Sequence, residues 1–346
     1  MNHGADIAAG RFAHHGGRLC VARSLFPNVP QPWIDLSTGI NPSSYPAPRA
    51  SAQARNRLPE PTELARLEAV AAEAFGVADP LRVVATGGTE NALRLLPYVL
   101  KIGGATVAGP TYGSHSDAWS RAGAKVEVVA DSQLAARSAS GGAMTIVNPN
   151  NPDGRILGRD QLQSLHDSLR IKDGVLIVDE AFGDLAPQHT VANLAGSEAA
   201  PRMLVLRSFG KFYGLAGVRL GFVIASPSIA TTLRQLLGDW PVSVDALSAG
   251  LAAYADQAWA QSTRVRLNRA AQRLDGLLIR SGMSIVGGTS LYRLARAIDA
   301  RARFTQLISH GVLVRPFDYD ATLLRFGLPA GRDGWQRLSA ALRMPA

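Results

Sequence analysis

Short apolar runs alternate with amphipathic segments between residues 81 and 224. The amphipathic segments have apolar residues at helical spacing. A segment of the same kind precedes them, where Leu64, Leu67 and Val70 follow a predicted threonine cap at Thr62. The apolar runs are rich in β-branched residues and end at turn residues, which is typical of buried strands. They are Leu81–Ala85, Ala105–Ala108, Lys125–Val129, Met144–Val147, Val175–Val178, Met203–Leu206 and Leu220–Ile224. This alternation predicts an α/β domain with a mixed, mostly parallel seven-stranded sheet between helices.

The pattern changes after residue 245. A long helical stretch, Asp245–Ser281, is followed by shorter strand-like and helical segments. The strands are expected at Met283–Val286, Ser290–Leu294, Val312–Pro316 and Leu323–Leu328, and the helices at Ala297–His310 and from Asp333. The sequence therefore predicts a large domain at 49–245, a small α+β domain at 246–346, and an N-terminal arm at 1–48 that packs with the small domain.

The composition is that of a globular protein, because 47% of the 346 residues are apolar and 18% are charged. The single cysteine, Cys20, excludes an internal disulfide, which favours a reducing compartment. No apolar run reaches the roughly 20 residues that a membrane helix requires. The first 16 residues are rich in Gly and His and lack the apolar stretch of a signal peptide. We therefore expect a cytoplasmic protein with no membrane partner.

The chain is basic, with a formal net charge of +9, and most of its cations are arginines. The lysines are Lys101, Lys125, Lys172 and Lys211. The arginines are scattered and form no basic run interleaved with aromatic residues, so we expect no nucleic-acid partner. Arginine binds carboxylates and phosphates through two parallel hydrogen bonds, which favours small anionic ligands.

A lysine follows the sixth predicted strand, in the segment Ser208-Phe209-Gly210-Lys211. Arg219 lies eight residues after this lysine, in a glycine-rich stretch. An amine at a strand end, beside a hydroxyl and a guanidinium, suits a Schiff base with a phosphorylated aldehyde, whose phosphate the other two groups would hold. Taken alone, the segment is about as consistent with a surface lysine in a glycine loop.

Two other motifs follow predicted strands. Asp179 ends an apolar strand, where α/β folds bind ligands, so its carboxylate is placed to pair with a protonated pyridine nitrogen. The alternatives are a helix cap or a metal-binding pair with Glu180, although no histidine cluster supports a metal site. The segment Asn148–Gly154 predicts a rigid loop whose asparagine can donate to a phenolate oxygen, or else an ordinary turn.

Three weaker signals complete the set. The segment Thr86–Asn91 offers free backbone N–H groups and the Thr89 hydroxyl as a phosphate cradle, or is a plain capped helix start. Tyr112, after the next strand, is suited to stack on a planar heterocycle, or belongs to the core. Arg325, near the C-terminus, is suited to hold a carboxylate, or is a solvated arginine on an edge strand.

Together these motifs resemble the aspartate-aminotransferase-like, fold type I enzymes that depend on pyridoxal 5′-phosphate (PLP). The resemblance spans residues 35–330 and depends on the order of the motifs and on their places at strand ends. It is carried by Gly88, Thr89, Tyr112, Asn151, Pro152, Asp153, Gly154, Asp179, Ala181, Phe182, Ser208, Lys211, Arg219, Arg325 and Gly327.

The resemblance implies a role for each matching residue. Lys211 would carry PLP covalently, and Asp179 would pair with its pyridine nitrogen. Asn151 would donate to the phenolate oxygen, Tyr112 would stack on the ring, and Arg325 would bind the α-carboxylate of the substrate. The cofactor phosphate would be held by Gly88, Thr89, Ser208 and Arg219.

The N-terminal arm resembles one particular group of enzymes within this family. His15-Gly16-Gly17 and the segment Trp33–Pro42 are similar to the decarboxylases of this family that act on L-threonine O-3-phosphate in cobalamin (vitamin B12) synthesis. This implies a homodimeric carbon–carbon lyase with a small phosphorylated amino acid as substrate. His15 and Asn41 would line the substrate pocket, and Arg315 would bind the substrate phosphate.

Two positions depart from the family pattern. Phe182 stands where many aminotransferases have a tyrosine that donates to the phenolate oxygen. Leu58 stands where relatives often supply a tyrosine to the PLP phosphate of the neighbouring subunit. The resemblance therefore implies a shared, dimeric active site that lacks one of its usual contacts.

Two other functions stay open from the sequence. One is an aminotransferase with a phosphorylated substrate such as histidinol phosphate, because substrate orientation decides between decarboxylation and transamination. The other is a non-catalytic PLP-binding module of the kind fused to DNA-binding domains. The Gly/Pro-rich first 60 residues, which show no helix-turn-helix pattern, argue against this second alternative.

Overall fold

The computed structural model describes residues 10–343, and the contacts within the chain divide it into two compact units. The large unit comprises Ser44–Asn151 and Arg155–Ala260, and the small unit comprises Met1–Ser43, Pro152–Gly154 and Gln261–Ala346. The beginning of the polar N-terminal segment, residues 1–9, lies outside the described residues, as do residues 344–346. The domain boundaries expected at 48 and 245 stay predictions.

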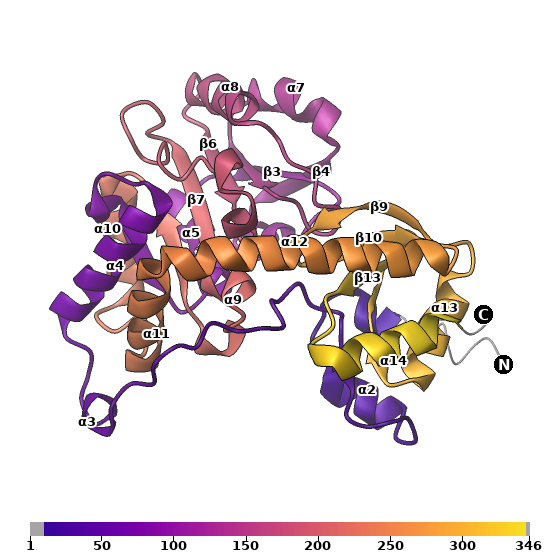
Figure 1. Ribbon diagram of the computed structural model, residues 1–346. Helices are drawn as coiled ribbons and strands as arrows, with labels where there is room; N and C mark the ends of the chain where they lie inside the picture. Colours follow the sequence, from indigo (N-terminus) through magenta and orange to yellow (C-terminus); the bar gives the residue numbers. More distant parts are fainter. Residues whose placement is uncertain (1–9, 344–346) are drawn as a thin grey trace. The chain divides into compact units, whose positions relative to one another are not determined.

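A mixed seven-stranded sheet forms the centre of the large unit (Figure 1). The strand order is β2-β8-β7-β6-β5-β3-β4, and β8 runs antiparallel to both of its neighbours while the other pairs are parallel. The strands are β2 (Val83–Thr86), β3 (Gly104–Ala108), β4 (Lys125–Val129), β5 (Ala143–Val147), β6 (Val175–Asp179), β7 (Met203–Ser208) and β8 (Gly221–Ile224). This confirms the predicted mixed, mostly parallel sheet of seven strands.

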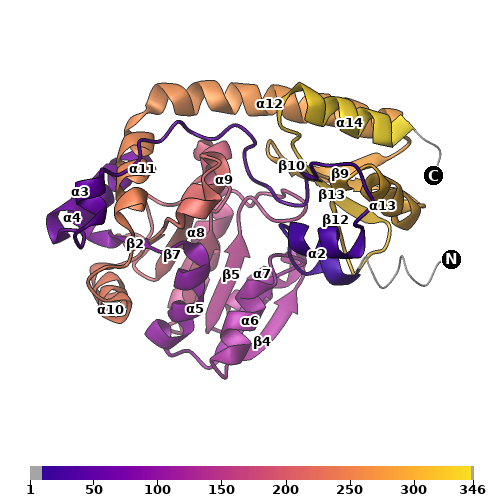
Figure 2. The ribbon, with the colours of Figure 1, turned by 90° about the horizontal axis from the view of Figure 1, so that it is seen from below.

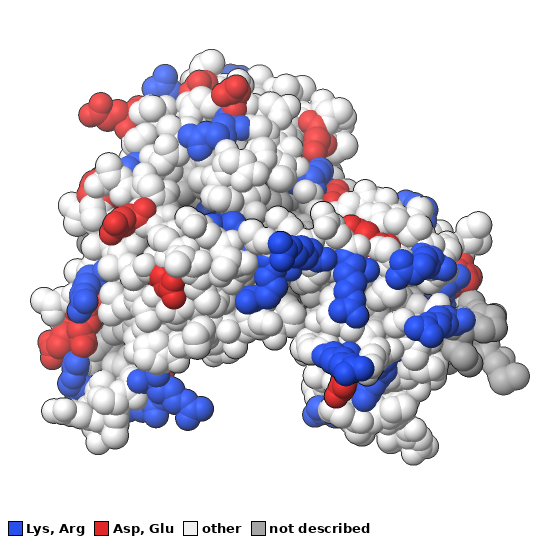
Figure 3. Space-filling model, viewed as in Figure 1, with Lys and Arg blue, Asp and Glu red and all other residues white. Residues whose placement is uncertain are grey.

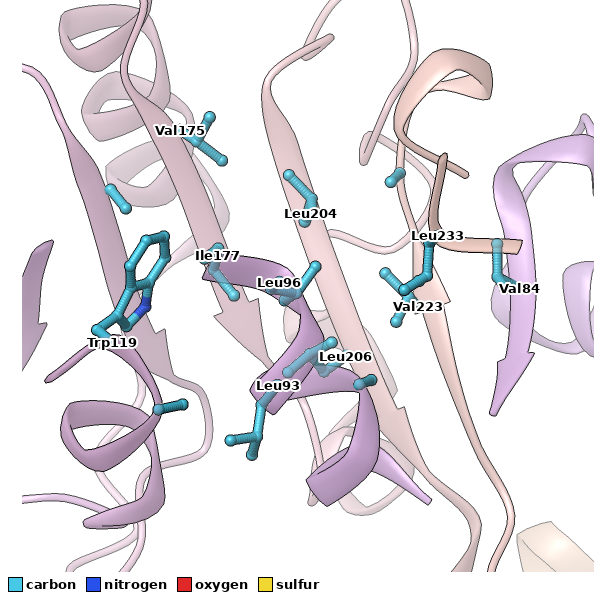
Figure 4. Close-up of a cluster of buried hydrophobic side chains, with 14 of the residues drawn as sticks. Val84, Leu93, Leu96, Trp119, Val175, Ile177, Leu204, Leu206, Val223 and Leu233 are labelled. Atoms are coloured by element: carbon cyan, nitrogen blue, oxygen red, sulfur yellow. The ribbon is translucent and has the colours of Figure 1, made fainter. Parts of the chain in front are cut away.

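Both faces of the sheet are buried. Along β6, Val175 and Ile177 join an apolar cluster (Figure 4) with side chains of the helices α5 (Thr89–Leu100), α6 (Ser114–Arg121) and α10 (Pro227–Leu237). Figure 2 shows α5 and α6 along this face of the sheet. Leu176 and Val178 alternate with the first two residues and therefore point to the opposite face, where they are also buried. Burial on both faces explains why the strands read as continuous apolar runs.

The other helices of the large unit are α3 (Ala52–Arg55), α4 (Pro61–Phe75), α7 (Leu134–Ser138), α8 (Arg159–Arg170), α9 (Phe209–Phe212) and α11 (Val244–Ala255). The threonine cap expected for α4 is wrong, because the helix has Glu60 as its cap residue and Pro61 as its first residue. Proline suits this position since it has no N–H to satisfy. The Glu63 carboxylate accepts the Glu60 N–H at 3.0 Å, which completes the cap.

The single long helix expected at Asp245–Ser281 is also wrong. The chain forms α11 and then α12 (Gln257–Arg280), with a break at Asp256, whose backbone is not helical at φ −92° and ψ 75°. The Asp256 carboxylate accepts the N–H of Trp259 at 2.9 Å and so begins the second helix. Apolar periodicity continues across this break, and for this reason the pattern alone does not reveal it.

The small unit is an α+β structure, as predicted. Its antiparallel sheet has the order β12-β13-β10-β9, and a second sheet pairs β1 of the N-terminal arm with β11 in parallel. The strands are β1 (Ile34–Asp35), β9 (Ser284–Thr289), β10 (Tyr292–Arg296), β11 (Val312–Leu313), β12 (Arg315–Pro316) and β13 (Leu323–Gly327). Besides α12 from residue 261, its helices include α2 (Leu19–Leu25), α13 (Ala300–Ser309) and α14 (Gly331–Arg343). Between residues 10 and 343, no helix has the length and apolarity needed to span a membrane.

A buried ion cluster joins the end of β7 to the segment after β6. Arg207 donates to Glu180 Oε2 at 2.9 Å and pairs with Asp184, and all three side chains are buried. Burial acts to lower the pKa of Arg207, but the negative charges of Asp184 and Glu180 outweigh it and raise that pKa. Glu180 also accepts the Val191 N–H at 2.7 Å. The cluster thus fixes the chain next to Asp179 and Ser208.

We expect Arg207→Met to lower the free energy of unfolding by about 3–5 kcal/mol, because it leaves two buried carboxylates without a cation. Urea denaturation of the purified variant measures this loss. Arg137→Met is the matched control: its ion pair with Glu127 is exposed, so its loss should stay below about 1 kcal/mol. Equal stability losses in the two variants would contradict a structural role for the buried cluster.

Candidate active site

A cavity of about 250 Å³ lies at the carboxyl ends of the parallel strands of the large unit. Ligands bind at this edge in open α/β sheets, because the loops after adjacent strands converge there. Eight residues predicted from the sequence line this one cavity: Gly88, Thr89, Tyr112, Asn151, Asp179, Ser208, Lys211 and Arg219. Segments far apart in the sequence therefore supply a single site.

One end of the cavity is built to hold an anion. Gly88 precedes the first residue of α5 and has a φ of +93°, and a Cβ at this position would lie 2.7 Å from Arg219 Nη2. A Cβ on Gly221 would similarly lie 2.6 Å from the Thr89 backbone nitrogen. Gly88 therefore allows the Arg219 guanidinium, and Gly221 allows the start of β8, to approach the start of α5 closely. With the hydroxyls of Thr89 and Ser208, this arrangement offers the groups that a phosphate cradle needs.

A buried carboxylate lies elsewhere in the cavity wall. Asp179 is 4% exposed, its Oδ2 lies 2.8 Å from His115 Nε2, and its Oδ1 accepts the Ala181 N–H at 2.9 Å. A carboxylate only accepts hydrogen bonds, so the proton between the two side chains belongs to His115. These two bonds fix the orientation of a negative charge that is shielded from water.

The sequence reasoning missed His115. The available signal was its spacing: His115 follows Tyr112 by three residues, and the turn that begins α6 brings the two together, with the His115 N–H donating to the Tyr112 carbonyl at 3.3 Å. The two rings meet edge to face, with 6.1 Å between their centroids. A histidine at this spacing from a predicted ring-stacking residue was a candidate partner for a carboxylate in the same site.

We expect His115→Phe to weaken PLP binding by about 10- to 100-fold, since it removes a hydrogen bond to a charged group worth about 1.5–3 kcal/mol. Titration of the apoprotein with PLP, followed by absorbance, measures the change. His115→Gln keeps a donor and should recover part of the affinity. If His115→Gln and His115→Phe bind PLP equally weakly, the ring acts through packing and the hydrogen bond has no role.

Tyr112 is held by a second acidic residue of the cavity, Glu90. The Tyr112 hydroxyl donates to Glu90 Oε2 at 3.1 Å, and Arg94 donates to Glu90 Oε1 at 2.8 Å. Burial is the main cause that raises the pKa of Tyr112, and the negative charges of Glu90 and Asp179 raise it further. The phenol therefore stays protonated at neutral pH, and its ring has a fixed place in the cavity wall.

The three asparagines in the loop after β5 have different roles. Asn148 accepts the Leu157 N–H at 2.8 Å, and Asn150 accepts from the Thr111 hydroxyl at 2.6 Å. These two side chains hold the turn, whereas Asn151 lines the cavity. Phe182 also lines the cavity, where its phenyl ring has no hydrogen-bonding group.

Lys211 lies in the short helix α9, directly after β7. Aromatic rings fix the chain on both sides of it: Phe209 and Tyr213 are stacked with centroids 4.8 Å apart, and Tyr213 and Trp259 are stacked with centroids 5.5 Å apart. This packing restricts the backbone that carries the amine, so Lys211 enters the cavity from a rigid segment.

The remaining predicted residues, Arg325, Arg315, His15 and Asn41, belong to the small unit. Arg325 is 3% exposed and donates to the Ser37 carbonyl at 2.5 Å. Its strand, β13, lies between β12 and β10, so the alternative of a solvated arginine on an edge strand is wrong. Burial, and secondly the positive charge of Arg315, lower the pKa of Arg325. A guanidinium that has lost water in this way attracts an anion strongly.

Arg315 joins the N-terminal arm to the core of the small unit. Its Nε donates to the Ala13 carbonyl at 3.2 Å and its Nη2 to the His14 carbonyl at 3.1 Å. The His14 and His15 rings are 4.3 Å apart, which places His15 in the arm segment that Arg315 holds. Asn41 accepts the Ser43 N–H at 3.0 Å and so forms a local turn.

The cavity of the large unit fits PLP. Its cradle suits a phosphate, its buried carboxylate suits a protonated pyridine nitrogen, and Lys211 supplies an amine for the aldehyde. Gly88 supports this fit, because a side chain there would fill the cradle. In the described part of the chain, no group of three or more His, Cys, Asp or Glu residues is placed to hold a metal ion.

The strand order of the sheet and this site define the protein as a PLP-dependent enzyme of fold type I. A family model described as aminotransferase class I and II matches residues 31–343. The chain therefore belongs to the aminotransferase class I and II family.

Two relatives are similar to this protein in sequence over most of the chain. A threonine-phosphate decarboxylase from Pseudomonas aeruginosa is 38% identical over 330 residues, which cover 95% of this chain and 96% of that protein. A histidinol-phosphate aminotransferase from Stenotrophomonas maltophilia is 30% identical, with coverages of 87% and 88%. The solved structure of a histidinol-phosphate aminotransferase from Sinorhizobium meliloti in complex with pyridoxal 5′-phosphate superposes with a TM-score of 0.75. It is 21% identical and covers 84% of this chain and 83% of that one, which shows the fold.

Proposed function

We propose that the protein decarboxylates L-threonine O-3-phosphate to (R)-1-aminopropan-2-yl phosphate and carbon dioxide, for the aminopropanol side chain of cobalamin. The observation that carries this proposal is the similarity to the P. aeruginosa threonine-phosphate decarboxylase, which extends over nearly the whole length of both chains. The site agrees with it, since PLP chemistry needs an amine, a buried carboxylate and a phosphate cradle in one cavity.

Bound PLP supplies an electron sink for the electron pair that carbon dioxide leaves at the substrate Cα. Asp179 would keep the pyridine nitrogen protonated, because its charge is buried and held by two hydrogen bonds. Asn151 would donate to the phenolate oxygen. Phe182, which lines the same cavity, adds no second donor, so only one of the two usual hydrogen bonds to that oxygen is available from these positions.

Lys211 has two roles in this proposal. Its amine would hold the cofactor, and after carbon dioxide has left, its Nζ would return a proton to the substrate Cα. Protonation at Cα gives the amine product, whereas protonation on the cofactor would lead to transamination. The rigid segment around Lys211 limits where this proton is delivered.

The small unit would supply the groups that bind the substrate. Arg325 would bind the carboxylate and Arg315 the phosphate, because both guanidiniums are buried and anions are their natural partners. His15 and Asn41 would line the substrate pocket. Binding energy from the phosphate, remote from the reacting bond, can be used to orient the carboxylate for departure.

We also infer that the protein is a cytoplasmic homodimer with no nucleic-acid or membrane partner. Its N-terminal arm, large domain and small domain would meet near residues 48 and 245. The homodimer is what the resemblance of the motifs to this family implies. Light scattering coupled to size exclusion measures the oligomeric state.

The test of function uses the purified holoenzyme with L-threonine O-3-phosphate and no keto acid. Carbon dioxide and the phosphorylated amine should form together and catalytically, as followed by mass spectrometry. The aminotransferase alternative, favoured by the 30% identity to the S. maltophilia enzyme, needs a keto acid. Turnover only with histidinol phosphate and 2-oxoglutarate would replace the proposed function by that alternative.

A further inference from the structure

The excess positive charge of the protein lies entirely in the small unit. Its described residues include 17 arginines and 7 aspartates, for a net charge of +10, whereas the large unit has 19 basic and 19 acidic residues. Figure 3 shows Lys and Arg side chains gathered along α12 and over α14, on a face with few acidic side chains. A charge distribution of this kind attracts anions to one part of the molecule.

A surface groove of about 390 Å³ lies within this basic face, between α12, the start of α14 and the arm. Arg266 and Arg273 border it on α12 with Ala270 between them, and Arg332 borders it on α14. Trp335 forms part of its wall, and the Arg273 guanidinium lies 4.2 Å above the Trp335 ring. None of the described residues that line the groove is acidic.

The groove collects positive charge from two helices. Arg332 lies in the first turn of α14, where the helix dipole disfavours a cation and favours an anion. Asp333, in the same turn, offsets part of this charge. Arg273 is also held in place by its stacking on Trp335, which leaves less side-chain entropy to lose when it binds a ligand.

We propose that this groove is a second anion-binding site, outside the cofactor cavity and next to the expected substrate pocket at Asn41, and that it takes a small phosphate-bearing molecule. Three guanidiniums beside a helix N-terminus are the groups that hold phosphates in proteins. The volume of the groove lies within the range of small-molecule sites. An acidic tail of a protein partner is the other source of such charge, and the experiment below distinguishes it.

The groove also touches the segments that hold Arg325, and this part of the inference rests on the proposed function. Asn41–Ser43 line the groove shortly after Ser37, whose carbonyl accepts from Arg325, and Leu328 and Pro329 line it directly after β13. An anion in the groove holds both segments and thereby the Ser37–Arg325 bond. The site is therefore coupled to binding of the substrate carboxylate.

The test titrates the holoenzyme with inorganic pyrophosphate by calorimetry, in the presence of saturating (R)-1-aminopropan-2-yl phosphate to fill the substrate site. The wild type should show one saturable site, and the double variant Arg273→Gln, Arg332→Gln should bind at least about 10-fold more weakly. The matched control is Arg280→Gln, Arg343→Gln, which removes the same charge from a neighbouring arginine-lined groove and should bind as the wild type does. The single variant Arg332→Glu, which changes an exposed side chain, should also lose pyrophosphate binding.

Equal pyrophosphate affinity in the wild type and in the double variant overturns the proposal, as does binding only of a polyglutamate peptide. Pyrophosphate should also lower the wild-type KM for L-threonine O-3-phosphate by about 5-fold or more, with no such change in the double variant. A wild-type KM that does not respond overturns the coupling. If the substrate is misidentified, decarboxylation fails, but the difference in pyrophosphate binding between the wild type and the double variant persists.

Discussion

Lys211→Ala is expected to abolish the visible absorbance of the bound cofactor and to lower kcat by about 10²- to 10⁴-fold or more, because one amine is proposed both to hold the cofactor and to move the proton at Cα. The structure supports this double role, since Lys211 lies in the same cavity as the phosphate cradle and Asp179. Absorbance spectra of the purified variant and a discontinuous carbon dioxide assay measure the two effects separately.

Lys125→Ala is the matched control for this experiment. Lys125 is exposed at the start of β4 and lies outside the cavity, so its variant should keep the wild-type spectrum and rate. Normal absorbance and turnover in Lys211→Ala would exclude Lys211 as the cofactor lysine. Weak residual activity that exogenous methylamine increases would support the proton-transfer role, since a free amine then replaces the missing one.

Asp179→Asn is expected to lower kcat by about 10²- to 10⁴-fold and to weaken PLP binding, because it removes the buried negative charge proposed to pair with the pyridine nitrogen. Breaking a buried charge pair costs about 3–5 kcal/mol, and each 1.36 kcal/mol is tenfold in rate. Asparagine keeps the shape of the side chain, so the change isolates the charge. Steady-state rates and a PLP titration of the apoprotein measure both quantities.

Asp173→Asn provides the control for Asp179→Asn. Asp173 is exposed and has a φ of 54°, a left-handed conformation that asparagine tolerates, so its variant should behave as the wild type in both assays. A wild-type rate in Asp179→Asn would contradict the pairing of this carboxylate with the cofactor. A lower stability without a change in rate would reduce Asp179 to a structural residue.

Much of the site was predictable because its residues lie at the ends of β-strands. Each of Asp179, Ser208 and Thr86 ends a β-strand, and the sequence shows these places as a polar residue after a buried apolar run. Since parallel strands present their carboxyl ends at one edge, a polar residue at each end predicts a common site. His115 escaped this reasoning because it lies inside a helix and reaches the site through its contacts with Asp179 and Tyr112.

Local backbone details were less predictable. Apolar periodicity runs through the break at Asp256, and the start of α4 depends on a carboxylate that reaches back to its cap residue. Both features depend on single hydrogen bonds, which leave little trace in a pattern of apolar positions.

The sequence by itself determined the fold class and the candidate cofactor residues, because buried strands must be apolar on both faces and chemistry-bearing residues must follow them. Only the tertiary structure decided which side chains hold these residues in place. Three sets of contacts show this: His115 bonds to Asp179, Arg207 is buried between two carboxylates, and Arg315 donates hydrogen bonds to the arm. Each joins positions 23 or more residues apart in the sequence. The same holds for the division of charge between the units, since +9 is a property of the composition, whereas its collection on one unit depends on how the chain folds.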